Sequence, residues 1–137
     1  TRTPESEYSP TPMPGGGRFS VVRVERDSTQ RLWSFADDGS DPRLVLEEVR
    51  PVGYHAWIDA DRLALFVLGD PPTLRVGAVS TGRARSVARD IGRSIQRVPG
   101  RRAITFTQPI GGDWWIREID FDTRQARAVA RMRTARA

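Results

Sequence analysis

The sequence contains no cysteine and no lysine, and His55 is its only histidine. Without cysteine the chain forms no disulfide and no thiolate metal site. One histidine, with carboxylates scattered over separate turns, also argues against a metal centre. No apolar run approaches the roughly 18 residues that a membrane-spanning helix needs. We therefore expect no metal, no cofactor and no membrane span.

The absence of lysine leaves 22 arginines to balance 17 acids, which gives a net charge of +5. This excess lies at the end of the chain, because residues 1–122 are formally neutral. The five remaining arginines are Arg124, Arg127, Arg131, Arg133 and Arg136. The composition thus indicates a basic tail and not a basic domain.

Short apolar segments alternate with turn residues along the whole chain, which favours β-strands over helices. The clearest pair is 52–58 and 62–68, joined by the polar turn at 59–61. Asp38-Gly39 is typical of a hairpin turn, because glycine accepts the positive φ that such turns need. The other predicted strands are 18–25, 31–35, 43–47, 73–79, 84–88, 93–98, 103–107, 114–121 and 126–130. A short extended segment is expected at 8–14, where the prolines exclude a central position in a sheet.

Equivalent positions recur at a nearly constant interval. Leu32 and Leu74 are 42 residues apart, and so are Leu74 and Ile116. A period near 40 residues that contains four short strands indicates the blades of a β-propeller. We predict an all-β fold of three four-stranded antiparallel blades in a single domain, 1–137, which would make half of a six-bladed ring. The predicted blades are 8–48, 49–90 and 91–131, with irregular ends at 1–7 and 132–137.

Three blades leave two apolar flanks open, because a propeller ring usually has about four to eight blades. Two solutions are possible. The chain is a piece of a longer ring whose remainder is missing, or two copies form a homodimer that closes a six-bladed ring around a two-fold axis.

Three phrases of the sequence resemble the TolB-type (WD40-like) β-propeller proteins of bacteria. They are YSPTPMPGGGRFSVVRVERDSTQRLWSF, PVGYHAWIDADRLALFVLG and IGRSIQRVPG. The resemblance covers about residues 8–122. It implies a six-bladed ring and an exported protein, periplasmic or secreted, but it implies no catalytic residues.

Candidate ligand-binding residues lie on the predicted first strands of blades 2 and 3. They are Tyr54, His55, Arg93 and Gln96, which would line the channel or its mouth. His55 titrates near neutrality, so it is a candidate for acid–base work. The alternative is a structural histidine that is hydrogen-bonded to a neighbouring blade. Arg93 suits an acidic ligand, or else an ion pair with an adjoining blade.

A catalytic triad can be assembled from Ser94, His55 and Asp59, but no nucleophile-elbow spacing accompanies it. Trp33, Trp114 and Trp115 are candidates for a partner interface. One of Trp114 and Trp115 must face each side of its strand. Four arginines fall on fourth strands at the outer rim, where they either bind nucleic acid or protect an exposed edge strand. They are Arg83, Arg85, Arg127 and Arg131.

These features favour a non-catalytic binding or scaffold module that recognises a protein or a small ligand at the mouth of the ring. One alternative is the propeller part of a hydrolase or another enzyme, which predicts a contact between His55 and a hydroxyl group. A second alternative is nucleic-acid binding through the basic tail at 123–137. That tail lacks the aromatic residues that usually accompany such binding.

Overall fold

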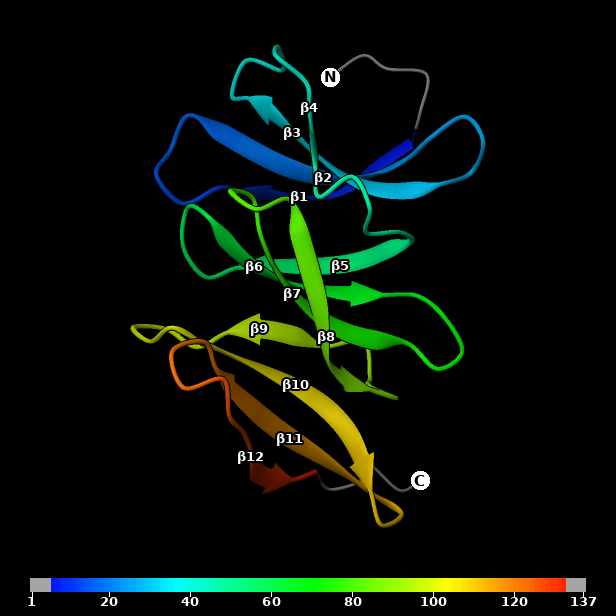
Figure 1. Ribbon diagram of the computed structural model, residues 1–137, viewed down its shortest axis with the longest axis vertical. Helices are drawn as coiled ribbons and strands as arrows, with labels where there is room; N and C mark the ends of the chain where they lie inside the picture. The colour runs from blue at the N-terminus through cyan, green and yellow to red at the C-terminus, as the bar shows by residue number, and fades with distance from the viewer. Residues whose placement is uncertain (1–5, 133–137) are drawn as a thin grey trace.

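The computed structural model describes residues 6–132, in which it shows strands and no helix. Twelve strands form three four-stranded antiparallel sheets, each built from four consecutive strands. In Figure 1 the sheets are stacked in chain order, with β1–β4 at the top and β9–β12 at the bottom. The predicted all-β fold of three four-stranded blades is confirmed. Since the described residues hold no helix, none of them forms a helical membrane span.

The sheets are named blades 1, 2 and 3. Blade 1 contains β1 (Ser6–Pro12), β2 (Arg18–Val24), β3 (Gln30–Ala36) and β4 (Arg43–Val45). Blade 2 contains β5 (Val52–Trp57), β6 (Arg62–Val67), β7 (Thr73–Ala78) and β8 (Arg83–Arg89). Blade 3 contains β9 (Ile95–Arg97), β10 (Ala103–Ile110), β11 (Asp113–Asp120) and β12 (Ala126–Arg131).

Strand β6 has a continuous apolar sequence because a hydrophobic core covers each of its two faces. Leu63, Leu65 and Val67 pack into the core between blades 1 and 2. Ala64 and Phe66 point the other way, into the core between blades 2 and 3. Successive side chains of a strand face opposite sides, so a strand that is covered on both faces must be apolar at every position.

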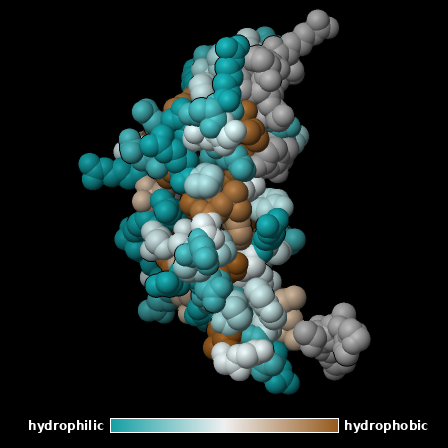
Figure 2. Space-filling view, turned by 90° about the vertical axis from the view of Figure 1, so that its right-hand side faces the viewer, coloured by the Kyte–Doolittle hydropathy of each residue, from teal (hydrophilic) through white to brown (hydrophobic). Residues whose placement is uncertain are grey.

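Most of the large apolar side chains are buried between successive blades. Figure 2 shows apolar side chains only as separate patches on a mostly hydrophilic face. The larger exposed apolar residues are Tyr54, Val79, Ile110, Trp114, Val129 and Met132.

The turn at Asp38-Gly39 forms as predicted. Gly39 has φ of 86°, and its N–H donates to the carbonyl of Ala36 at 2.8 Å. The Asp38 carboxylate accepts the backbone N–H of Ser40 at 2.9 Å. The sequence therefore closes this hairpin by local hydrogen bonds.

Three predicted boundaries need correction. Strand β1 begins at Ser6, inside the stretch 1–7 that was expected to be irregular. Strand β4 ends at Val45 because Leu46 turns to a φ of 56° and buries its side chain between blades 1 and 2. Strand β9 starts at Ile95, so Arg93 precedes it. The predicted irregular ends lie outside the described residues at 1–5 and 133–137.

Candidate binding site between two blades

His55 lies in the contact between blades 1 and 2. Its Nε2 is 2.7 Å from the hydroxyl oxygen of Ser20 on β2. The same hydroxyl oxygen accepts the indole N–H of Trp57 at 2.9 Å. Trp57 and His55 share a face of β5, as their spacing predicts. One serine of blade 1 thus binds two side chains of blade 2.

Burial lowers the pKa of His55 from its ordinary 6.5 to about 4. The imidazole is therefore neutral at pH 7. The Ser20 oxygen also lies 3.5 Å from the carbonyl oxygen of Thr11, to which its hydroxyl donates. Nδ1 of His55 is buried and has no hydrogen-bond partner among the described residues.

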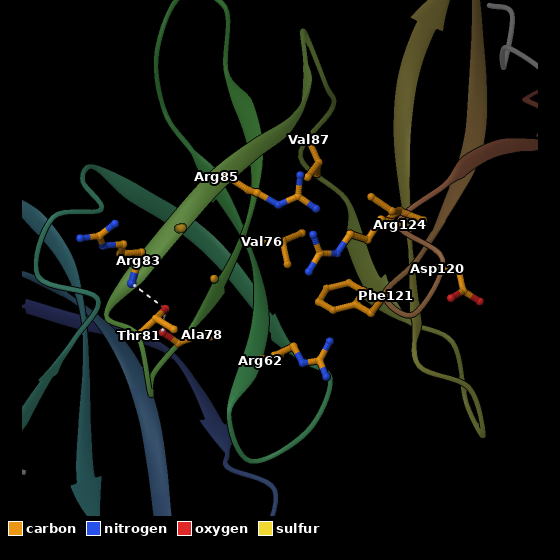
Figure 3. Close-up of a pocket in the computed structure, with 13 residues that line it drawn as sticks. Arg62, Val76, Ala78, Thr81, Arg83, Arg85, Val87, Asp120, Phe121 and Arg124 are labelled. Atoms are coloured by element: carbon orange, nitrogen blue, oxygen red, sulfur yellow. Dashed lines mark hydrogen bonds between the residues drawn. The ribbon is translucent and has the colours of Figure 1, made fainter.

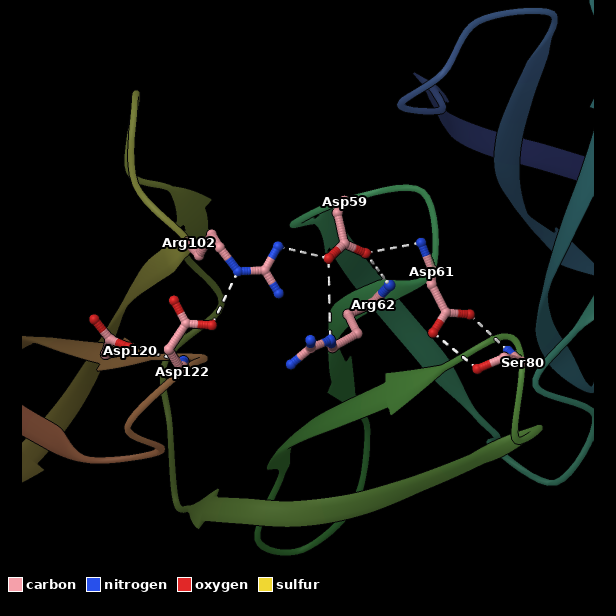
Figure 4. Close-up of polar contacts among 7 residues, drawn as sticks. All are labelled: Asp59, Asp61, Arg62, Ser80, Arg102, Asp120 and Asp122. Carbon is pink, nitrogen blue, oxygen red and sulfur yellow. Dashed lines mark hydrogen bonds and ion pairs between the residues drawn. The ribbon is translucent and has the colours of Figure 1, made fainter.

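The residues of the hypothetical triad are not brought together. Asp59 accepts a hydrogen bond from Nη1 of Arg102 at 2.7 Å, which joins blades 2 and 3 (Figure 4). Arg102 also donates to Asp122 at 3.0 Å. Ser94 is exposed just before β9, and His55 bonds to Ser20 on the other side of blade 2.

Asp59 also organises its own turn. Its Oδ1 accepts the backbone N–H groups of Asp61 at 2.8 Å and of Arg62 at 2.7 Å. Burial alone would raise the pKa of Asp59. The backbone N–H of Arg62 and the Arg102 guanidinium outweigh burial and lower this pKa to about 2. The carboxylate is therefore ionised wherever the protein is folded near neutral pH.

The predicted channel residues do not form one cluster. Tyr54 faces blade 3 and makes an edge contact with Phe66, with ring centroids 5.8 Å apart, whereas His55 faces blade 1. Strands β5 and β9 lie side by side, which brings Gln96 to the strand next to Tyr54. Arg93 and Gln96 are exposed. Among residues 6–132 no hydrogen bond or ion pair links Tyr54 with either of them.

The three candidate interface tryptophans lie on third strands. Trp114 is 42% exposed and faces away from blade 2, whereas Trp115 faces it by strand alternation. Trp33 lies on the opposite end of the stack, with the guanidinium of Arg23 4.5 Å from its ring centroid. Its indole N–H donates to Glu25 at 2.8 Å.

A groove of about 410 Å³ separates the outer parts of blades 2 and 3, and we call it the interblade groove. Its apolar wall comprises Val76 and Val87 from blade 2, with Ile119 and Phe121 from blade 3. Its polar lining is dominated by four arginines: Arg62, Arg83, Arg85 and Arg124.

The backbone aims side chains at this groove. Arg85 pairs with Val76 across β8 and β7, so the two share a face. A register shift then follows, because Leu74 pairs with Ala88 and Arg75 pairs with Ser86. The extra residue is Val87, and both Val87 and Ala88 pack on the core that faces blade 3. A bulge of this kind redirects a side chain without breaking the strand.

Positive charge in the interblade groove is largely uncompensated. Arg83, Arg85 and Arg124 have no ion-pair partner within residues 6–132, and Arg62 approaches Asp59 only at 4.0 Å. The carboxylate of Asp120 accepts the backbone N–H groups of the β11–β12 turn, which lower its pKa. In Figure 3 it points away from the space beside Phe121, whereas Arg85 and Arg124 extend towards that space from opposite walls.

Only part of this site was visible in the sequence. Arg83 and Arg85 were singled out on the predicted outer rim, but their convergence with Arg124 was not. No local pattern marks it, because the two walls come from different blades.

Stacked four-stranded antiparallel sheets with cores between successive sheets define the class of protein, which is a β-propeller. The structure is similar to TolB from Acinetobacter baumannii, with a TM-score of 0.58 and 25% identity over 72% of this chain and 26% of that one. The chain accordingly has a TolB-like propeller structure.

Two further structures share the fold. A TolB-type protein from Agrobacterium tumefaciens matches with a TM-score of 0.67 and 16% identity, over 90% of this chain and 45% of that one. The propeller domain of the trilobed protease from Pyrococcus furiosus matches with a TM-score of 0.67 and 9% identity, over 95% and 45%. The chain thus spans a quarter to a half of these structures. No family model and no curated protein matches it.

Proposed function

We propose that this chain is a non-catalytic binding module that takes an anionic ligand in the interblade groove. The observation that supports it is the convergence of Arg85 and Arg124 on an open groove, where neither forms an ion pair within residues 6–132, although Asp120 is part of the lining. Guanidinium groups bind carboxylates, phosphates and sulfonates through charge-assisted hydrogen bonds. A volume of about 410 Å³ is in the range of small-ligand sites.

The enzyme alternative predicted a contact between His55 and a hydroxyl group, and Ser20 makes one. Ser20 is 0% exposed, however, and its oxygen is already engaged by Trp57. A nucleophile must reach its substrate, and this hydroxyl lies between two packed blades. We therefore interpret the pair as a structural contact.

The nucleic-acid alternative is weakened by ion pairs of the basic tail. Arg127 pairs with Glu118 at 3.2 Å, and Arg131 approaches Asp113 at 3.7 Å. These arginines lie on the edge strand β12, where charge also discourages pairing with another strand. Arg133 and Arg136 lie outside the described residues.

Titration with inorganic phosphate tests the proposal, with backbone amide NMR shifts as the readout. We expect saturable shifts in β8 and at 119–124. The double substitution Arg85→Gln with Arg124→Gln should abolish them. Arg89→Gln with Arg97→Gln removes the same charge outside the groove and should leave them unchanged. Shifts centred on Tyr54 and Gln96 would place the ligand at the first strands instead, and shifts at every arginine would refute a specific site.

We also propose a periplasmic or secreted location, which rests on the likeness to TolB. Fractionation of the source cells, followed by immunodetection, tests it. Recovery with the cytoplasmic marker would contradict the proposal.

A further inference from the structure

The interblade groove has a polar side and an apolar side. Arg85 and Arg124 extend from opposite walls, and Val76 and Phe121 lie beside the charged ends of both in Figure 3. Phe121 and Ile119 are each 4% exposed and form the packed floor of the groove, whereas Val76 and Val87 are only partly buried. A free inorganic anion would contact the guanidinium groups and leave Val76 and Val87 in water.

Arginine stems can cover apolar surface, which would explain part of the composition without any ligand. In that explanation each guanidinium points into water, away from the apolar surface. In Figure 3, Arg85 and Arg124 extend instead towards the space beside Phe121, where neither has an ion-pair partner in residues 6–132. Asp120 is engaged by the backbone of its own turn. Like charges beside a poorly hydrated wall repel one another, and a bound anion would remove that repulsion.

We infer that the interblade groove binds an amphiphilic anion, with its acidic head between Arg85 and Arg124 and its apolar body on Val76, Val87 and Phe121. This inference rests on the proposed function, because it specifies the ligand of the same groove. A ligand with a carboxylate, sulfonate or phosphate monoester on a ring or a short acyl chain would contact both the arginines and the apolar wall. The volume accommodates a ligand of this size.

The test uses two fluorescent probes that share an aromatic body. 1-Anilinonaphthalene-8-sulfonate carries an anionic head, and N-phenyl-1-naphthylamine carries none. We expect saturable one-to-one binding of the sulfonate, at least about tenfold tighter than the neutral probe. Raising the salt concentration from about 50 to about 500 mM should weaken binding of the sulfonate and not of the neutral probe, because salt screens exposed charges.

Variants separate the two sides of the groove. Arg85→Gln with Arg124→Gln should weaken the sulfonate by about tenfold or more, as expected for two lost charge-assisted bonds. The charge-matched control, Arg89→Gln with Arg97→Gln, should stay within about twofold. Val87→Thr keeps the side-chain shape but adds a hydroxyl group. It should weaken binding of the sulfonate and leave binding of phosphate unchanged. Near-ultraviolet circular dichroism must match wild type for each variant, because the sulfonate also binds unfolded protein.

The possible failures are distinct. Equal affinity for both probes, or no effect of the groove substitutions, overturns the inference. Phosphate binding in the groove without tighter binding of the sulfonate overturns the amphiphile and keeps the proposed function. No binding of either anion overturns both.

Discussion

Ser20 shows how much one small residue contributes to the contact between two blades. Its hydroxyl oxygen is 2.7 Å from His55 Nε2 and 2.9 Å from Trp57 Nε1, and it has no exposed surface. Polar groups buried without partners are costly, so the three side chains depend on one another.

Substitution Ser20→Ala should destabilise the protein by about 1–3 kcal/mol, because it leaves the indole N–H and an imidazole nitrogen unpaired. Ser94→Ala, at an exposed serine before β9, is the control and should change stability by less than about 0.5 kcal/mol. Urea unfolding followed by tryptophan fluorescence measures both. Equal stability of Ser20→Ala and wild type would contradict the role assigned to Ser20.

The pKa of His55 predicts a pH dependence of stability. The folded protein holds the imidazole neutral to about pH 4, whereas the unfolded chain protonates it near pH 6.5. Between these values the unfolded state binds more protons, so stability falls as the pH is lowered through this window. The His55 contribution to that loss should reach roughly 2–3 kcal/mol.

Urea unfolding at about pH 7 and about pH 4.5 measures this loss, and the variant His55→Gln isolates the histidine from the carboxylates. Glutamine keeps a hydrogen-bonding group for Ser20 but does not titrate. The variant should lose less stability than wild type over the same range. An identical loss would show that His55 does not contribute.

At the scale of elements, an ion pair joins turns of successive blades. Arg102 precedes β10 and donates to Asp59, in the turn between β5 and β6 (Figure 4). Asp61 of that turn accepts the hydroxyl of Ser80 at 2.8 Å, which ties it to the turn between β7 and β8. One short polar turn thus links two hairpins of blade 2 with blade 3.

Substitution Arg102→Ala should remove this link and destabilise the protein only slightly, because solvent screens the pair. Hydrogen exchange should accelerate in β10 and β11 more than in β2 and β3. Arg97→Ala, on β9 and exposed, is the matched control. Uniform acceleration over all three blades, or none, would contradict a local role for Arg102.

At the scale of the whole molecule, the stack ends in two flanks that carry tryptophan. Trp114 is 42% exposed on blade 3, and Trp33 lies on blade 1 beneath Arg23. The blade 3 flank is not wholly apolar, because Glu118 is buried there between Arg101 and Arg127. We propose that two copies meet through these flanks and close a six-bladed ring.

Light scattering should then give twice the 15.4 kDa of the chain. Trp114→Arg should reduce the mass to that of one chain, since it places a charge in the contact. Val129→Arg is the control, because Val129 is 48% exposed on the outer strand β12. A monomeric wild-type protein would refute the dimer.

The strand pattern, the hairpin turn at Asp38-Gly39 and the three-blade repeat were predictable from the sequence. Each depends on residues close together along the chain: alternation within a strand, φ at a glycine, and apolar residues on both faces of β6. The 42-residue spacing of Leu32, Leu74 and Ile116 only repeats such local patterns, so it needed no knowledge of packing.

The tertiary structure alone decided which distant residues meet. Ser20 and His55 are 35 positions apart, and Asp59 and Arg102 are 43 apart. Arg85 and Arg124 line the same groove only because β8 of blade 2 lies opposite the β11–β12 turn of blade 3. Such contacts depend on the relative placement of separate sheets, which packing of their whole faces determines and no local spacing encodes.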